Sequence, residues 1–69
     1  MEKLKEYRKK TGLSQQKLAK LVGISKPYYN QLENGSRRFN LPVAKKVASI
    51  LAKELEAPVT KVYTDIFLP

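Results

Sequence analysis

Residues 14–35 read SQQKLAKLVGISKPYYNQLENG and contain the start signals of two short helices. Ser14 can cap the first helix, because its hydroxyl oxygen can accept a hydrogen bond from a free backbone amide at the helix start. Ser25 repeats this signal eleven residues later. Gly23 lies between the two helices, where a glycine can adopt a positive φ without steric strain. The stretch therefore predicts two short helices joined by a tight turn.

The bounds of the second of these helices depend on Pro27. A proline fits the first turn of a helix, but the residue before a proline is disfavoured in the helical conformation. The cap is therefore either Ser25 or, one residue later, Lys26. Asn34-Gly35 ends the helix in both cases, since these two residues readily adopt the left-handed conformation of a helix end.

The rest of the chain predicts further helices and a single all-α domain over residues 1–69. We expect a first helix over Glu2–Lys10 and a fourth helix over about 41–55, capped by Asn40. Apolar residues in these segments recur at three- and four-residue spacing, as on the buried face of a helix. The residues expected to face inward on the second and fourth helices are Leu18, Ala19, Leu21, Val22, Leu41, Ala44, Val47, Ala48, Leu51, Ala52 and Leu55.

The segment 58–69 fits more than one structure. A short helix can run from Pro58 to Tyr63, or it can be displaced by one turn to include residues 65–67. The β-branched run over 59–64 also allows a strand, and an irregular tail is a further alternative. We expect a short fifth helix.

Positive charge is concentrated in the first half of the chain. The 69 residues carry a formal net charge of +8. Residues 1–38 contain ten basic and three acidic side chains, whereas residues 39–69 contain four and three. Such a field attracts polyanions, so nucleic acid is the first partner to expect and anionic lipid the second.

Several function classes are disfavoured by composition. Cysteine and histidine are both absent, which removes disulfides, thiolate zinc sites and histidine-based acid–base catalysis. The six carboxylates are scattered, which does not favour a metal-dependent nuclease. No apolar run approaches the roughly 20 residues of a membrane span, and the charged segment after Met1 does not predict a signal peptide. We expect no cofactor, no enzymatic activity, no membrane partner and a cytoplasmic location.

Three motifs resemble the phage-repressor and Cro-like helix-turn-helix family. They are LSQQKLA at 13–19, GIS at 23–25 and QLENG at 31–35, followed by a basic loop and an apolar helix. The resemblance covers nearly the whole chain. It implies a compact, lambda-repressor-like domain of about five helices, with the 25–34 helix in the major groove of DNA. It also implies that Gln15 binds a phosphate.

Arg8 and Glu33 match positions that form a buried ion pair in some family members. The charge distribution supports this independently, because Glu33 is the only acidic residue between Glu6 and Glu54. A lone carboxylate beside DNA would repel phosphates unless a cation neutralised it.

Three residues depart from the family pattern. Pro27 stands where a longer polar side chain often reads bases, which leaves apolar contact with a thymine methyl. Tyr29 replaces the usual aliphatic core residue and needs a hydrogen-bond partner for its hydroxyl. Glu56 stands where a glycine commonly ends the fourth helix.

Residue chemistry divides the expected DNA contacts into two sets. Asn and Gln can donate and accept together at adenine, and Lys can donate to guanine, whereas most other polar contacts position a protein on phosphates. The residues expected to contact bases are Ser25, Lys26, Pro27, Asn30 and Gln31. The residues expected to contact phosphates are Gln15, Lys17, Tyr28, Asn34, Ser36, Arg37 and Arg38.

The leading hypothesis is a sequence-specific regulator that binds double-stranded DNA, represses transcription and acts as a homodimer on a palindromic operator. Two recognition helices about 34 Å apart would add specificity that one helix lacks. The alternative is a protein-interaction or antitoxin-like module that binds a partner protein. Its expected contact residues are Val43, Ile50, Ile66, Phe67 and Leu68, although Val43 and Ile50 can instead widen the buried stripe of the fourth helix.

Overall fold

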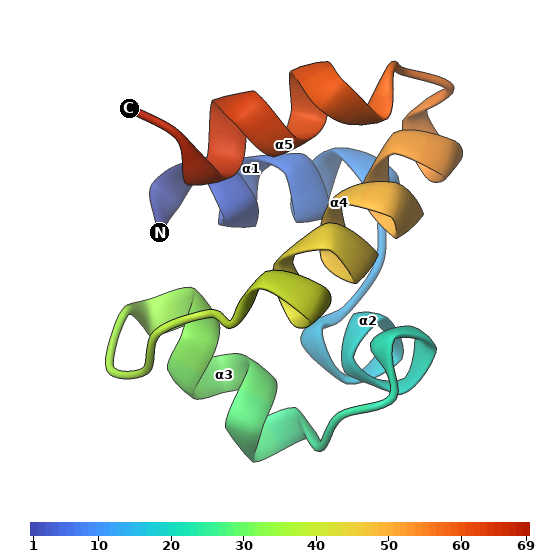
Figure 1. The fold of residues 1–69 in the computed structure, drawn as a ribbon. Helices are drawn as coiled ribbons and strands as arrows, with labels where there is room; N and C mark the ends of the chain where they lie inside the picture. The colour runs from blue at the N-terminus through green and yellow to red at the C-terminus, as the bar shows by residue number, and fades with distance from the viewer.

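A computed structural model describes residues 1–69 and contains five α-helices and no strand. The helices are α1 Glu2–Thr11, α2 Gln15–Val22, α3 Lys26–Asn34, α4 Leu41–Leu55 and α5 Val59–Phe67. In the view of Figure 1, α4 runs between the pair α1 and α5 and the pair α2 and α3, and it packs against α1, α2 and α5. No helix has the length and apolar character that crossing a bilayer requires. The expected all-α fold of five helices is confirmed.

Side-chain caps begin α2, α3 and α4. The Ser14 hydroxyl accepts a hydrogen bond from the Lys17 backbone N–H at 3.0 Å, and Ser25 accepts one from the Tyr28 N–H at 3.2 Å. Ser25, and not Lys26, is therefore the cap of α3. Lys26 takes the first helical position, because the cap hydrogen bond offsets the bias against helical conformation before a proline.

Residues in the left-handed conformation end the first four helices. Gly23 ends α2 with a φ of 91°, and the turn to α3 follows from it. Glu56 ends α4 with a φ of 52° and is the only non-glycine residue with a positive φ. A side chain with a Cβ is strained there by roughly 1–2 kcal/mol. The fourth helix thus ends at the position where the family commonly has a glycine, but here the residue is a strained glutamate.

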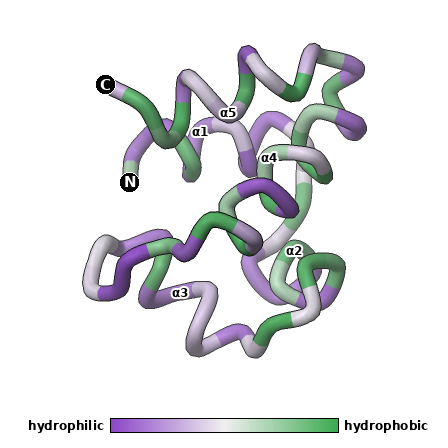
Figure 2. The backbone as a smooth tube through the Cα atoms, viewed as in Figure 1, coloured by the Kyte–Doolittle hydropathy of each residue, from purple (hydrophilic) through white to green (hydrophobic).

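The core forms around α4, which supplies Val47, Ala48, Leu51 and Ala52 from one face. Figure 2 shows hydrophobic colours on α4 between the two helix pairs. Val43 and Ile50 are half-buried against this core, so they widen the buried stripe of α4. The other core residues are Leu4, Leu18, Ala19, Val22, Tyr29, Val62 and Ile66.

Two residues expected to face inward are exposed. Leu21 is 44% exposed and Leu41 is 55% exposed. The buried face of α2 consists of Leu18, Ala19 and Val22. The Leu21 side chain is rotated by about 100° from that of Val22, on the side away from Ala19. Leu41 occupies the first turn of α4, which extends beyond the packed part of the helix. The expectation was therefore wrong for both leucines.

The last helix combines the two helical alternatives for the C-terminal segment, and the strand alternative is wrong. It begins after Pro58 and continues to Phe67. Val62 and Ile66 are four residues apart and both buried, which makes one face of a short helix apolar. Packing of this face against the core favours the helix and outweighs the strand preference of the β-branched residues.

Candidate nucleic-acid interface

The side of α3 that is turned away from the core is exposed and polar. Tyr29 and Leu32 are fully buried and attach the helix to the rest of the fold. Figure 2 shows α3 at the edge of the molecule, mostly in hydrophilic or neutral colours. The residues of the predicted base-contacting set, all of them exposed, are Ser25, Lys26, Pro27, Asn30 and Gln31. Gln15 and Arg37 contact two of these residues, Asn30 and Gln31, without burying them.

The predicted phosphate-contacting residues surround this face. Gln15 and Tyr28 are half-buried, and the exposed ones are Lys17, Asn34, Ser36, Arg37 and Arg38. The two ion pairs of the chain, Arg8–Glu33 and Lys61–Asp65, involve none of the cations in the two predicted sets. These cations are not neutralised within the chain, so their field remains available to an anionic ligand.

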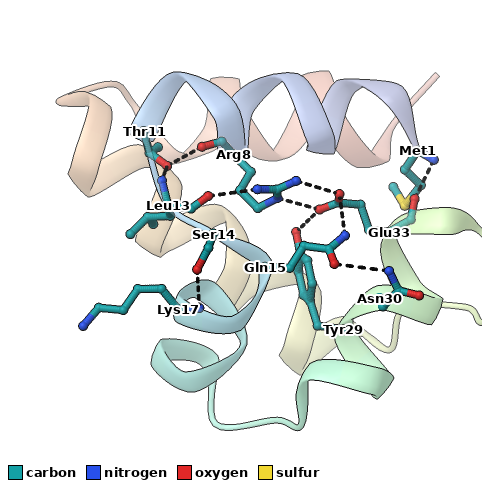
Figure 3. Close-up of polar contacts among 10 residues, drawn as sticks. All are labelled: Met1, Arg8, Thr11, Leu13, Ser14, Gln15, Lys17, Tyr29, Asn30 and Glu33. Atoms are coloured by element: carbon teal, nitrogen blue, oxygen red, sulfur yellow. Dashed lines mark hydrogen bonds and ion pairs between the residues drawn. The ribbon is translucent and has the colours of Figure 1, made fainter.

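A buried carboxylate joins α1, α2 and α3 behind the exposed face. Arg8 donates from Nε to Glu33 Oε2 at 2.9 Å and from Nη2 to Oε1 at 3.1 Å, and its Nη1 donates to the Leu13 carbonyl at 2.9 Å. The Tyr29 hydroxyl donates to Glu33 Oε2 at 2.5 Å, and Gln15 Nε2 donates to Oε1 at 3.1 Å. Figure 3 shows these side chains meeting at Glu33. The pair that the sequence predicts between Arg8 and Glu33 is thus part of a four-residue cluster.

These contacts determine the charge states in the cluster. Burial alone would raise the pKa of Glu33, but hydrogen bonds from Arg8, Tyr29 and Gln15 outweigh it and hold that pKa below its ordinary value. The hydrogen bond to Glu33 raises the pKa of the Arg8 guanidinium despite its burial. Burial, and then the hydrogen bond to Glu33, raises the pKa of the Tyr29 hydroxyl. Glu33 is therefore ionised and Tyr29 neutral near neutral pH.

A chain of side-chain amides runs from this cluster to the exposed face. Gln15 donates its Nε2 to Glu33, and its Oε1 accepts from Asn30 Nδ2 at 3.2 Å. Asn34 Nδ2 donates to Asn30 Oδ1 at 3.5 Å, and Asn34 Oδ1 accepts from the Ser36 backbone N–H at 2.9 Å. An ionised carboxylate can only accept and a backbone N–H can only donate. Every hydrogen bond of this chain of amides is therefore donated in one direction, from Ser36 toward Glu33. Figure 3 shows the start of this chain at Gln15 and Asn30.

A second contact lies at the C-terminal end of α3. Arg37 donates from Nε to Gln31 Oε1 at 2.7 Å, and its guanidinium carbon lies 5.3 Å from the centroid of the Tyr28 ring. The loop after Gly35 thus returns to the exposed face of α3. The side chains of three predicted site residues meet there.

Several contacts had no counterpart in the sequence interpretation. The Met1 amino group donates to the Glu33 carbonyl at 2.9 Å, and Tyr7 donates from its hydroxyl to Asp65 Oδ2 at 2.5 Å. No sequence pattern indicates either of these long-range contacts. The Tyr29 partner could have been found, because Tyr29 and Glu33 are four residues apart and such pairs lie side by side on a helix.

Comparison with known proteins identifies the family of this chain. A family model described as Helix-turn-helix matches residues 4–57, which include α1 to α4 and the whole exposed face of α3. The chain belongs to the helix-turn-helix family. This confirms the family expected from the sequence motifs. Members of this family are DNA-binding regulators, so the chain carries a DNA-binding helix-turn-helix domain.

Three curated proteins are similar to this helix-turn-helix chain. A propionyl-CoA carboxylase regulator of Cereibacter sphaeroides is 45% identical over 63 residues, which are 91% of this chain and 13% of that protein. An uncharacterised HTH-type transcriptional regulator of Bacillus subtilis, YqaF, is 38% identical over 48 residues, 70% of this chain and 63% of that protein. Control protein C.MunI of a Mycoplasma species is 35% identical over 65 residues, 93% of this chain and 82% of that protein.

The chain therefore spans a small part of the first relative, somewhat less than two thirds of the second, and most of the third. No solved structure gives a significant match to it. The structure contains no group of three or more His, Cys, Asp or Glu side chains that could hold a metal ion.

Proposed function

We propose that this chain is a sequence-specific regulator that represses transcription by binding a palindromic DNA operator as a homodimer. The observation that carries the proposal is the exposed face of α3. Lys26, Asn30 and Gln31 lie accessible on that face, and Tyr29 and Leu32 attach the opposite face to the core. A helix presented in this way fits the major groove, where its polar side chains can reach base edges.

In this proposal, the predicted base contacts are made by Ser25, Lys26, Pro27, Asn30 and Gln31. Lys26 donates to guanine, and Pro27 makes apolar contact with a thymine methyl. The phosphate contacts come from Gln15, Lys17, Tyr28, Asn34, Ser36, Arg37 and Arg38. The unpaired cations of this set support the assignment, since phosphate contacts supply most of the affinity for DNA of any sequence.

The size of one recognition helix supports the homodimer. A nine-residue α3 reaches only a few base pairs. Two copies bound one helical turn apart, about 34 Å, read two half-sites on one side of the duplex. Repression then results from occupation of a promoter by this dimer. The names of the three relatives support a regulatory role, since two contain the word regulator and one the word control.

The alternative with a protein partner has less support. Ile66 is buried, and Val43, Ile50 and Phe67 are half-buried against the chain's own core. The Phe67 ring lies 4.9 Å from the Phe39 ring, centroid to centroid. Only Leu68 among the five expected contact residues is largely exposed, at 52%.

Selection from a random pool of duplexes tests the proposed function. We expect the selected sequences to contain two half-sites in inverted orientation, with centres separated by a whole number of helical turns. Affinity for these duplexes should fall steeply as salt rises, because bound phosphates release counterions. A single unrepeated half-site would contradict the homodimer, and binding with no salt dependence would contradict the regulator itself.

A further inference from the structure

The contact between Gln31 and Arg37 has a defined direction. Arg37 Nε lies 2.7 Å from Gln31 Oε1, and a guanidinium N–H can only donate. The amide oxygen of Gln31 is therefore the atom held by Arg37. Gln31 Nε2 forms no hydrogen bond within the chain and lies at the accessible end of the side chain.

The loop that carries Arg37 is itself held against α3. The Arg37 backbone N–H donates to the Gln31 carbonyl at 3.2 Å, and the Ser36 hydroxyl donates to Asn34 Oδ1 at 2.7 Å. The Tyr28 ring lies beneath the guanidinium at 5.3 Å, a distance at which a cation is attracted to the ring face. Gly35, with a φ of 87°, makes the sharp turn that brings the loop back. The partner of Gln31 is thus positioned before any ligand binds.

We propose that Arg37 is a positioning residue that biases Gln31 toward base recognition through its NH₂ group. This inference rests on the proposed function. A glutamine that reads adenine in the bidentate manner must offer its oxygen to N6 and its NH₂ group to N7. The oxygen has two lone pairs, and Arg37 already takes one of them on the loop side, so acceptance from N6 is weakened while both hydrogens of the NH₂ group stay free. Gln31 therefore favours a base with acceptors only at its major-groove edge, and guanine, with O6 and N7 side by side, fits best.

The proposal refines the expected role of Arg37. The Nη groups of Arg37 have no hydrogen-bond acceptor within the chain and can still contact a phosphate, as the sequence predicts. Arg38 follows it in the same loop, carries the same charge and contacts no predicted base-reading side chain. The two arginines therefore form a matched pair, in which only Arg37 should affect base preference.

The first test measures the contact without DNA. In nuclear magnetic resonance spectra of the free protein, the Arg37 Nε–H signal should exchange more slowly with water in wild type than in Gln31→Ala. Equal exchange rates would overturn the preorganised contact, whatever DNA the protein binds. Circular dichroism of each variant verifies that the helices are retained.

The second test uses the duplex that the wild-type protein selects. Gln31→Ala identifies the base pair that Gln31 reads, because discrimination there should fall by about tenfold. At that base pair, wild type should prefer guanine over adenine, and Arg37→Ala should reduce or reverse this preference. Arg38→Ala should weaken binding to all four bases by the same factor and leave the preference unchanged.

Three results of the duplex experiments would overturn the inference. The first is a wild-type preference for adenine at the Gln31 position. The second is an Arg37→Ala variant that weakens all four duplexes equally, like Arg38→Ala. The third is failure of the wild-type protein to select any duplex, which would reject the proposed function and this inference with it, whereas the first two results leave the proposed function intact.

Discussion

Gln15 Nε2 donates to Glu33 Oε1 at 3.1 Å, so the first residue of α2 is held by a buried carboxylate of α3. The family resemblance implies that Gln15 binds a phosphate. Its NH₂ group donates one hydrogen to Glu33 and keeps the other for a phosphate, and its oxygen accepts from Asn30. Gln15 thus connects the buried ion pair to a side chain proposed to read a base.

Gln15→Ala should therefore affect DNA recognition more than stability. We expect the free energy of unfolding to fall by about 1 kcal/mol or less, because Arg8 still bonds to the Glu33 oxygen. Affinity for the selected duplex should fall, and preference at the base read by Asn30 should relax. Gln16→Ala is the matched control, since Gln16 is exposed and forms no side-chain hydrogen bond. Titration of duplexes by fluorescence anisotropy would show equal effects of the two variants if the connection to Asn30 were unimportant.

Removing Arg8 should leave the buried charge of Glu33 without a cationic partner. We expect Arg8→Met to lower the free energy of unfolding in urea by roughly 3–5 kcal/mol, because Glu33 is 4% exposed and would lose its cation. The double variant with Glu33→Met should recover part of this loss, since no charge remains buried. The recovery is partial because the Tyr29 hydroxyl then lacks its acceptor. If the double variant were less stable than Arg8→Met, an unpaired buried charge could not be the cause of the lost stability.

The Glu33 cluster predicts that acid destabilises the protein. The pKa of Glu33 in the folded state lies below its ordinary value of 4.5, so the unfolded chain takes up the proton first as the pH falls. The stabilisation is complete above that ordinary value and is lost as the pH falls through the folded-state pKa. Urea unfolding at a series of pH values should give a shallower acid slope for Glu33→Gln. The residual slope should include Asp65, whose pKa is lowered by the Tyr7 hydrogen bond and then by Lys61. Identical slopes for both proteins would show that Glu33 is not the responsible group.

The strained end of α4 predicts a stabilising substitution. Glu56→Gly should raise the free energy of unfolding by about 0.5–1 kcal/mol, because relief of the left-handed strain exceeds the added flexibility of the unfolded chain. Glu54→Gly removes the same charge from an exposed position within α4 and should instead lower it by about 1 kcal/mol. Thermal and urea unfolding of the pair would give opposite signs. A decrease for both would mean that Glu56 is unstrained in solution.

Local signals in the sequence were sufficient for most of the secondary structure. Ser14, Ser25 and Asn40 cap helices because a side-chain oxygen three residues before a free amide forms its hydrogen bond locally. The sequence left α5 open, because burial of Val62 and Ile66 depends on where α1 and α4 lie. Leu21 and Leu41 were misplaced for the same reason, since an apolar residue at the edge of a stripe is buried only if another helix reaches it.

The sequence by itself determined the first four helices, the basic first half and the family, because caps, periodicity, charge and motifs act over a few residues or add up along the chain. The tertiary structure decided how the polar residues are connected. Glu33 meets Arg8, Gln15 and the Met1 amino group from positions 18 to 32 residues apart. Arg37 reaches Gln31 only because the loop folds back after Gly35. A hydrogen bond depends on distance and direction in space, and only packing of the helices sets these for residues far apart in the chain.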